Sequence, residues 1–402
     1  MIKRILSKVY KIIFNFAATI FPMQRGIVLF ESFNGKLPSD NPYAIYQELV
    51  KQAEKKNLYW GIKKDHIKEA RKQYPDLNLV PRFSIKWLWL ATRANFWVFN
   101  SRMPNWLKKN KETIYIQTWH GTPLKKLGAD IQEVAMPGTD TEKYKNNFIF
   151  EASRWDYLIA PNEYSEKIFK QAFQFRNHML EIGYPRNDEL VNNRNNEQRQ
   201  QELKKKIIGK DNGRVVLYAP TWRDDYFIKK GSYKFFMPFD LEKTLNCLEE
   251  DDTLIIRPHY LVGDSIDIKG YEDRVKVCIN EAINDLYLIS DLLITDYSSV
   301  MFDFAILKRP MLFYPYDMAH YKEKLRGFYL DYNEVPGPIA ENEAHFYKFL
   351  REFVLYGQFP QYEVKTRAFE QLFCSWEHGN AAEKISKLIT NENFGDQKNL
   401  GG

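Results

Sequence analysis

The stretch DLLITDYSSVMFD (Asp291–Asp303) contains a transition from a strand to a helix, the order of elements on which the predicted fold is based. Its first half is apolar, which predicts a buried strand ending at Asp296, and its second half has helical spacing. We expect Ser298 or Ser299 to cap that helix, where backbone N–H groups and the helix dipole can bind an anion. Asp303, inside the helix, can orient an arginine or bind a donor hydroxyl. The alternative is an ordinary helix cap without a ligand.

Apolar runs of this kind alternate with helical segments along the whole chain. The predicted strands are 26–33, 58–62, 95–100, 113–119 and 155–161 in the first half, and 214–220, 253–259, 275–279, 291–296 and 310–315 in the second. Strands that are apolar throughout are typical of parallel sheets covered on both faces. The polar stretch 191–206 is the best linker candidate. The sequence therefore predicts two α/β domains with a ligand-binding cleft between them.

Composition agrees with a folded protein of two domains. The chain has 402 residues, of which 44% are hydrophobic and 27% charged. A net charge of +6 does not require nucleic acid, but it favours an anionic membrane or a phosphate-rich substrate. Cys247, Cys278 and Cys374 are far apart in the sequence, which predicts buried thiols and neither a disulfide framework nor a zinc site.

The first 22 residues, MIKRILSKVYKIIFNFAATIFP, are too short an apolar run to span a bilayer. On a helical projection the apolar residues fall within an arc of about 100°, and the basic residues fall on the other side. The apolar set is Ile2, Ile5, Leu6, Val9, Ile13, Phe16 and Ile20, and the basic set is Lys3, Arg4, Lys8 and Lys11. Such a helix lies flat on an anionic leaflet. The alternative is a helix packed on the protein's own core.

A histidine follows one predicted strand directly, in the motif Trp119-His120-Gly121-Thr122. At the carboxyl end of a strand, before a glycine turn, its imidazole is accessible to a ligand and titrates near neutrality. These properties suit a general base that takes a proton from a hydroxyl nucleophile. The alternative is a hydrogen-bonded structural histidine in a turn.

Basic residues follow two strands of the second half. Thr221 and Arg223 come after the first of them, and a guanidinium can bind phosphate with two parallel hydrogen bonds. The alternative is a surface Arg223 stacked on Trp222. Arg257 and His259 end the next strand, where two cationic groups can hold a pyrophosphate and stabilise a leaving phosphate.

Several motifs are absent from the sequence. It has no G-x-G-x-x-G, G-x-x-x-x-G-K-[ST], D-x-D, H-E-x-x-H or G-x-S-x-G. These absences disfavour nicotinamide dehydrogenases, P-loop NTPases, metal–nucleotide sites and α/β hydrolases. We therefore expect no metal and no cofactor, with the cationic loops neutralising phosphate charge.

Four of these segments, taken in order, resemble the CDP-glycerol glycerophosphotransferase family of teichoic acid synthesis. They are QTWHGTPLKKLG, YAPTWRDD, RPH and ISDLLITDYSSVMFDFAILKRPMLFY, and EIGYPRND, WDYLIAPNEY, LRGFYLDY and PGPI are similar too. The match covers roughly residues 95–339 and most of the tail. The resemblance implies a GT-B-like fold of two Rossmann-type domains. The expected parts are a membrane-associating amphipathic helix (1–22), an acceptor-side domain (23–190), a CDP-donor domain (207–360) and C-terminal helices that pack back across both (361–392).

The resemblance also implies an activity and a set of residues. The expected enzyme transfers glycerol phosphate from CDP-glycerol to the terminal hydroxyl of an undecaprenyl-diphosphate-linked acceptor and releases CMP. It would be peripheral, at the cytoplasmic face of the cell membrane, without a nucleic acid partner. His120 matches the family's proposed base and His259 its second functional histidine, while Arg223, Ser298, Ser299 and Asp303 match positions around the donor phosphates. With Thr221 and Arg257 these form the predicted donor site, and Trp119, Gly121 and Thr122 form the predicted acceptor side.

The sequence departs from the family pattern at Glu377-His378-Gly379-Asn380, where an acidic residue is expected before the glycine. Three alternatives stay open at this point. They are a CDP-ribitol or other CDP-polyol phosphotransferase, a GT-B glycosyltransferase with a nucleotide-sugar donor, and a non-enzymatic membrane scaffold. The motifs also leave open the oligomeric state and whether the enzyme primes or extends the polymer.

Overall fold

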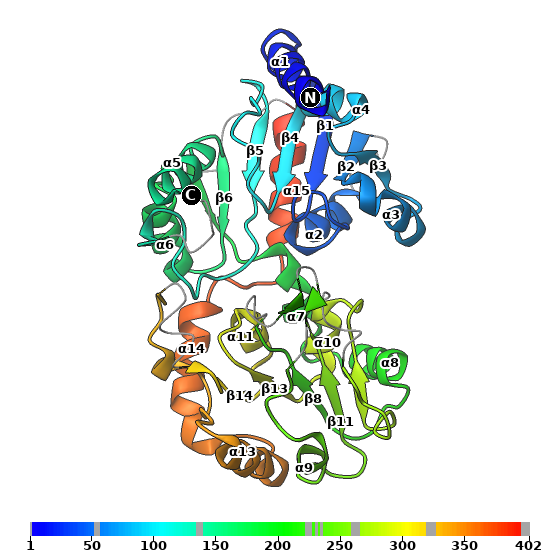
Figure 1. Ribbon diagram of the computed structural model, residues 1–402, viewed down its shortest axis with the longest axis vertical. Coiled ribbons are helices and arrows are strands. Elements are labelled where there is room, and N and C mark those ends of the chain that lie inside the picture. The colour runs from blue at the N-terminus through cyan, green and yellow to red at the C-terminus, as the bar shows by residue number, and fades with distance from the viewer. Residues whose placement is uncertain are drawn as a thin grey trace. The chain divides into compact units, whose positions relative to one another are not determined.

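A computed structural model describes residues 2–51, 57–133, 140–221, 227–229, 232–233, 236–258, 266–318 and 327–394. Contacts within the chain divide it into two compact units (Figure 1). Unit 1 comprises Met1–Gly121, Leu127–Asp188 and Trp376–Gly402, and unit 2 comprises Thr122–Lys126 and Glu189–Ser375. The chain enters unit 2 for the first time directly after Gly121. The domain boundaries and the cleft expected from the sequence stay predictions.

Unit 1 is built on a seven-stranded sheet in which every neighbouring pair is parallel. The order is β3-β2-β1-β4-β5-β6-β7, so the direction of winding reverses between β1 and β4. The strands are β1 (Gln24–Glu31), β2 (Leu58–Ile62), β3 (Asn78–Pro81), β4 (Ala94–Phe99), β5 (Ile114–Gln117), β6 (Tyr157–Ala160) and β7 (His178–Glu181). β4 is buried at every position, as expected for a central strand covered on both faces.

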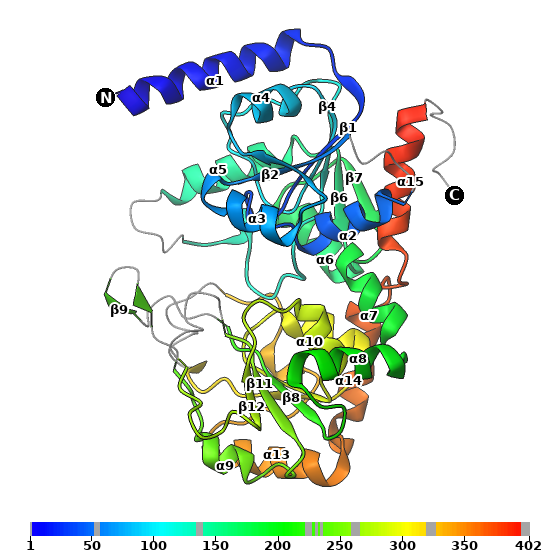
Figure 2. The same cartoon turned by 90° about the vertical axis from the view of Figure 1, so that its right-hand side faces the viewer.

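Helices cover both faces of this sheet. Apolar side chains of α2 (Asp40–Leu49), α3 (Ile67–Gln73) and α15 (Ala381–Phe394) share one core with β1, β2 and β4. α2 and α15 lie side by side (Figures 1 and 2). On the opposite face, α4 (Ile85–Ala91) contacts β1 through a Trp87–Glu31 hydrogen bond, and α5 (Thr141–Ala152) contacts β5 through Tyr115 and Glu151. α6 (Glu163–Ala172) and the short helices η2 (Lys64–His66), η3 (Gly128–Asp130) and η4 (Pro185–Asn187) complete the unit.

The N-terminal helix α1 (Ile2–Ile20) lies beside α4 in both views (Figures 1 and 2). It packs through a narrow stripe: Phe14 is fully buried and its ring centroid is 5.8 Å from that of Trp87. Asn15, which interrupts the apolar run, donates to the Trp106 carbonyl at 2.8 Å. The apolar side chains left exposed are Ile5, Leu6, Val9, Ile12, Ile13, Phe16 and Ile20. Among the described residues no helix is both long enough and apolar enough to cross a membrane.

Unit 2 is built on a five-stranded parallel sheet in the order β12-β11-β8-β13-β14. The strands are β8 (Val215–Tyr218), β11 (Thr253–Ile256), β12 (Val275–Val277), β13 (Leu292–Thr295) and β14 (Met311–Phe313), and β9 (Phe227–Lys229) pairs with β10 (Ser232–Tyr233) in a separate hairpin. α9 (Leu241–Leu245) and α13 (Glu343–Tyr356) cover one face of the sheet with a core that includes Phe346. The other helices in the described part of unit 2 are α7 (Asp188–Asn193), α8 (Glu197–Ile208), α10 (Ile283–Ile289), α11 (Val300–Phe304), α14 (Glu363–Phe373), η6 (Ala305–Leu307), η7 (Tyr332–Glu334) and η8 (Pro360–Tyr362).

The predicted class, parallel α/β with two sheets, is confirmed, and the buried strands lie where the apolar runs predicted them. The β9–β10 hairpin was not predicted, and neither were two strands of the seven-stranded sheet, β3 and β7. Both are edge strands with mostly half-buried or exposed positions, so they carry no continuous apolar run. The predicted strand 113–119 ends earlier, at Gln117. Trp119 cannot extend it because its φ of +52° is left-handed.

Candidate active site

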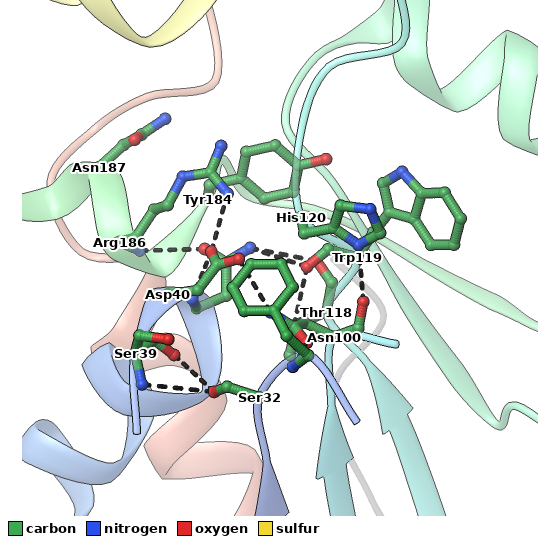
Figure 3. Close-up of polar contacts among 12 residues, drawn as sticks. Ser32, Ser39, Asp40, Asn100, Thr118, Trp119, His120, Tyr184, Arg186 and Asn187 are labelled. Atoms are coloured by element: carbon green, nitrogen blue, oxygen red, sulfur yellow. Dashed lines mark hydrogen bonds and ion pairs between the residues drawn. The ribbon is translucent and has the colours of Figure 1, made fainter. Parts of the chain in front are cut away.

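The polar residues around His120 come from the loops after β1, β4 and β5, from the start of α2 and from η4 (Figure 3). In doubly wound parallel sheets ligands bind at the carboxyl ends of the strands, next to the point where the winding reverses. The reversal in unit 1 lies between β1 and β4, and both strands contribute to the cluster. The sheet therefore places His120 at the edge where a ligand is expected.

The ring of His120 has a defined orientation. Its Nδ1 lies 2.7 Å from the backbone carbonyl oxygen of Asn100. A carbonyl oxygen can only accept, so Nδ1 must donate, and the lone pair of the neutral ring is on Nε2. Trp119 stacks on the ring at 4.6 Å between centroids, and Phe33 approaches it edge-on at 5.8 Å. The side chain is exposed to solvent, so Nε2 belongs to a ring that an incoming molecule can reach.

Two opposing influences act on the protonation of His120. Desolvation by the surrounding protein lowers the pKa of His120 below its usual value. Asp40 and the hydrogen bond to the Asn100 carbonyl raise this pKa, whereas Arg186 and Arg102 lower it further. Because the side chain is also exposed, water limits the desolvation. The net direction favours the neutral imidazole, which is the form that can accept a proton.

Trp119 stacks against the ring of His120 and is itself held by its neighbours. Its side chain is buried, with ring centroids of Phe173 at 4.7 Å and Phe169 at 5.9 Å. Its backbone N–H donates to Gln117 Oε1 at 3.0 Å, which stabilises the left-handed turn. Trp119 thus acts as a platform for the imidazole. Of the other two residues predicted on the acceptor side, Gly121 is half-buried and Thr122 is buried.

The described residues of the predicted donor site belong to unit 2. Thr221 follows β8, and its backbone N–H donates to Asp296 Oδ1, at the end of β13, at 2.8 Å. This bond joins the two strands on either side of the reversal in this sheet. Arg257 follows β11, and its Nη1 donates to the Cys278 carbonyl at 2.9 Å. Two predicted residues thus follow adjacent strands of one sheet, with Asp296 as an additional polar group.

The segment after Asp296 differs from the prediction in one respect. Ser299 occupies the N-cap position of α11, but its side chain makes no capping hydrogen bond. The reason is its backbone, since φ −67° and ψ −4° are helical, whereas a capping side chain needs extended backbone. Ser298 is half-buried, Ser299 is exposed and Asp303 is half-buried within α11. Arg223 and His259 lie outside the described residues.

Glu377, in the segment that departs from the family pattern, has a defined role in unit 1. Its carboxylate accepts the backbone N–H of Tyr184 at 3.2 Å and Nδ2 of Asn187 at 2.9 Å. Gly183 has φ +83°, and a Cβ there would lie 2.6 Å from Glu377 Oε2. Glu377 therefore fixes the turn that carries Arg186, which is a structural contact that the motif comparison did not predict.

Sequence reasoning also missed Asp40, Asn100 and Arg186, which lie near His120 (Figure 3), and Asn41, which donates to the Trp119 carbonyl. Asp40 and Asn41 lie in the polar loop NGKLPSDNP and Arg186 in EIGYPRND, two segments without a recognisable catalytic spacing. The one available signal was position, because Asn100 directly follows the strand β4.

The fold and the site define an α/β protein with a candidate histidine base and polar loops at the carboxyl ends of two parallel sheets. The sequence profile of the CDP-glycerol:poly(glycerophosphate) glycerophosphotransferase family matches residues 13–391. The chain therefore belongs to this family. The family and the enzyme class predicted from the sequence, a glycerophosphotransferase of teichoic acid synthesis, are confirmed.

Individual relatives agree. A teichoic acid glycerol-phosphate transferase of Staphylococcus aureus is 46% identical over 368 residues, covering 91% of this chain and 93% of the relative. A teichoic acid poly(glycerol phosphate) polymerase of Bacillus subtilis is 45% identical over 394 residues, covering 97% of this chain but 52% of the polymerase. The chain thus spans about half the length of that polymerase.

Solved structures extend the match to three dimensions. The wall teichoic acid polymerase TagF aligns with a TM-score of 0.86 and 39% identity, covering 98% of this chain and 96% of the TagF chain. A TagF variant soaked with CDPG aligns with a TM-score of 0.87. A UDP-N-acetylglucosamine 2-epimerase structure from Listeria monocytogenes aligns with a TM-score of 0.51 at 12% identity, which shows the fold alone.

Proposed function

We propose that this chain transfers glycerol phosphate from CDP-glycerol to the terminal hydroxyl of a lipid-linked teichoic acid acceptor, with His120 as the general base. The observation that carries this proposal is the fixed tautomer of His120, whose Nδ1–H is held by the Asn100 carbonyl at 2.7 Å. The neutral ring then presents the basic Nε2 lone pair on an exposed side chain. The acceptor is of the undecaprenyl-diphosphate-linked kind.

The reaction moves one proton and exchanges one phosphorus–oxygen bond. Nε2 of His120 accepts the proton of the acceptor hydroxyl as its oxygen attacks the β-phosphorus of CDP-glycerol. The bond from that phosphorus to the CMP oxygen breaks, and CMP leaves with the electron pair. Thr221, Arg223, Arg257, His259, Ser298, Ser299 and Asp303 are the proposed donor-site residues. Cationic and hydroxyl groups at the strand ends would stabilise the charge on the leaving phosphate without a metal or cofactor.

We infer that each unit is a Rossmann-type domain and that the chain has a GT-B-like fold. Both sheets are parallel and doubly wound, and both carry polar residues at the carboxyl end next to the reversal of winding. We assign the acceptor side to unit 1 and the donor side to unit 2.

Glycerol is favoured over ribitol by the degree of similarity. Glycerol-phosphate transferases and polymerases are 44–46% identical to this chain, whereas a ribitol-phosphate primase and a poly(ribitol-phosphate) polymerase are 26% and 25% identical. The test is to incubate the purified protein with CDP-glycerol, CDP-ribitol or a UDP-sugar and a lipid-linked disaccharide carrying glycerol phosphate. We expect CMP release and product mass increasing by glycerol-phosphate units with CDP-glycerol alone. Turnover of only another donor would overturn the assignment.

We further propose that α1 holds the enzyme on the cytoplasmic face of the membrane as a peripheral protein. Ile5, Ile12 and Phe16 are 53%, 69% and 63% exposed. On a helix of 100° per residue they point in nearly the same direction, and basic residues occupy the other side. Exposed apolar area of this kind inserts at the boundary between headgroups and acyl chains, and the basic residues attract anionic lipids.

Replacing Ile5, Ile12 and Phe16 together with serine is expected to weaken binding to phosphatidylglycerol vesicles by about 1,000-fold or more, because each buried apolar side chain contributes about 1.5 kcal/mol or more. Vesicle co-sedimentation measures the change. The matched control replaces Leu355, Tyr356 and Val364, which are also exposed but lie on unit 2, with serine. If the control loses as much binding as the α1 variant, α1 is not the anchor.

A further inference from the structure

Asp40 is hydrogen-bonded to the side chain of Asn100, and the backbone carbonyl of Asn100 orients the ring of His120 (Figure 3). Its Oδ2 accepts from Asn100 Nδ2 at 2.8 Å, and its Oδ1 accepts from Arg186 Nη1 at 2.7 Å. The other end of the Asn100 amide, Oδ1, accepts the backbone N–H of Phe33 at 2.7 Å. The Asn100 side chain is thus held at both ends, while its backbone carbonyl receives the Nδ1–H of His120.

The neighbouring residue holds the loop on the other side. Asn41 Nδ2 donates to the carbonyls of Thr118 and Trp119 at 3.3 and 3.2 Å, immediately before His120. Asn41 Oδ1 accepts the backbone N–H of Arg186 at 3.1 Å. Asp40 and Asn41, at the start of α2, therefore hold the two segments that position the imidazole of His120. Asp40 holds Asn100, and Asn41 holds the backbone directly before His120.

The backbone at these positions is strained. Phe33, Asn34, Asp40 and Trp119 have φ of +46°, +61°, +61° and +52°. The left-handed region costs an L-residue roughly 1–2 kcal/mol, less for Asn and Asp, so local preference alone does not produce this geometry. Strained residues persist where surrounding contacts over-determine them, and they cluster at functional sites. Here the contacts are those of the Asp40–Arg186 pair, whose side chains are 6% and 13% exposed.

We propose that Asp40 and Asn100, held by Arg186, are positioning residues that keep the His120 ring in the orientation needed to take the proton of the acceptor. They act through His120 and do not contact the substrate. This inference rests on the proposed role of His120 as the base, because without that role the orientation of the ring has no catalytic consequence.

The charged groups around His120 affect its pKa, so the proposed roles can be tested in the pH dependence of the activity. The charged groups that act on the imidazole are Asp40, from α2, Arg186, from η4, and Arg102, from the loop after β4. Asp40 raises the pKa of His120, and the two arginines lower it. Removing Asp40's charge must therefore lower this pKa, and removing Arg186's charge must raise it. Loss of packing alone would not shift the two profiles in opposite directions.

The experiment compares Asp40→Asn and Arg186→Gln in steady-state assays over pH. We expect kcat to fall about 100-fold in Asp40→Asn, because small misplacements of a reacting group have effects of this size, with little change in KM for CDP-glycerol. The acidic limb of kcat/KM should move to lower pH in Asp40→Asn and to higher pH in Arg186→Gln. In a His120→Ala background, Asp40→Asn should cause no further loss, because residues that act as a unit are not additive.

The matched control is Asp252→Asn. Asp252 is a buried aspartate paired with Arg214 at 2.9 Å in unit 2, with a side chain 3% exposed. It should lower the melting temperature yet leave the pH profile unchanged. The inference is overturned if Asp40→Asn keeps kcat within about threefold of wild type, or if the acidic limbs of kcat/KM of Asp40→Asn and Arg186→Gln shift in the same direction. It is also overturned if the losses of activity add in the double variant His120→Ala/Asp40→Asn. Full activity of His120→Ala alone would instead overturn the proposed base. If Asp40→Asn does not fold, the test is the acidic limb of kcat/KM in Arg186→Gln, which must move to higher pH.

Discussion

Replacing His120 with alanine is expected to lower kcat by about 1,000-fold while the affinity for CDP-glycerol stays within about threefold. A positioned general base contributes roughly 10²–10⁴-fold, and alanine has no group that can accept the proton. Donor affinity should persist because the proposed donor residues belong to unit 2, whereas His120 belongs to unit 1. CMP release in steady state gives kcat, and isothermal titration with CDP-glycerol gives the affinity.

The control for this variant is another exposed histidine of the same unit. His178 lies on the edge strand β7, is exposed and contacts the ring of Tyr157 at 5.2 Å between centroids. His178→Ala should therefore retain wild-type kcat. If His120→Ala kept kcat within about tenfold of wild type, general-base catalysis by this residue would be wrong. Equal loss of donor affinity and kcat would instead point to a binding role for the histidine.

The position of His120 was predictable because apolar strands and the residues directly after them are encoded locally. A continuous apolar run marks β5, and the residue after such a run in a parallel sheet must lie at the ligand-binding edge. The same reasoning identified Thr221 and Arg257 after β8 and β11. These predictions needed no knowledge of which strands are neighbours.

The residues that orient His120 could not be found in this way. Asp40 is 60 residues from Asn100 and 146 residues from Arg186 in the sequence, and each lies in a segment that reads as an ordinary polar loop. The contact of Asp40 with Asn100 follows from the order of strands in the sheet, which places β1 next to β4. A pattern of single residues does not contain that order. The left-handed conformation of Phe33 and Trp119 is also invisible in the sequence, because neither is a residue type that favours it.

Replacing Glu31 with alanine is expected to destabilise unit 1 by about 3–5 kcal/mol, the usual cost of removing one partner of a buried ion pair. Glu31 ends β1, and its side chain is 1% exposed. It pairs with Arg82 Nε at 2.8 Å and accepts from Trp87 Nε1 at 2.8 Å. Gly61 leaves the space for it, because a Cβ there would lie 2.4 Å from Glu31 Oε1. Alanine would leave a guanidinium in the core without its carboxylate.

Hydrogen exchange of the β1 amides measures this effect locally, which avoids treating two units as one cooperative transition. A loss of about 3 kcal/mol corresponds to roughly 100-fold faster exchange where opening of unit 1 limits it. Glu383→Ala is the control, because Glu383 pairs with Lys387 on the surface of α15 and should change protection little.

The double variant Glu31→Leu/Arg82→Met should exchange more slowly than Glu31→Ala, since apolar residues of similar size can replace both charges. Equal exchange in these two variants would show that the unpaired Arg82 guanidinium is not the cause of the lost stability. The strand that ends at Glu31 leads directly into the loop carrying Phe33, so this buried pair also anchors the backbone N–H that holds Asn100.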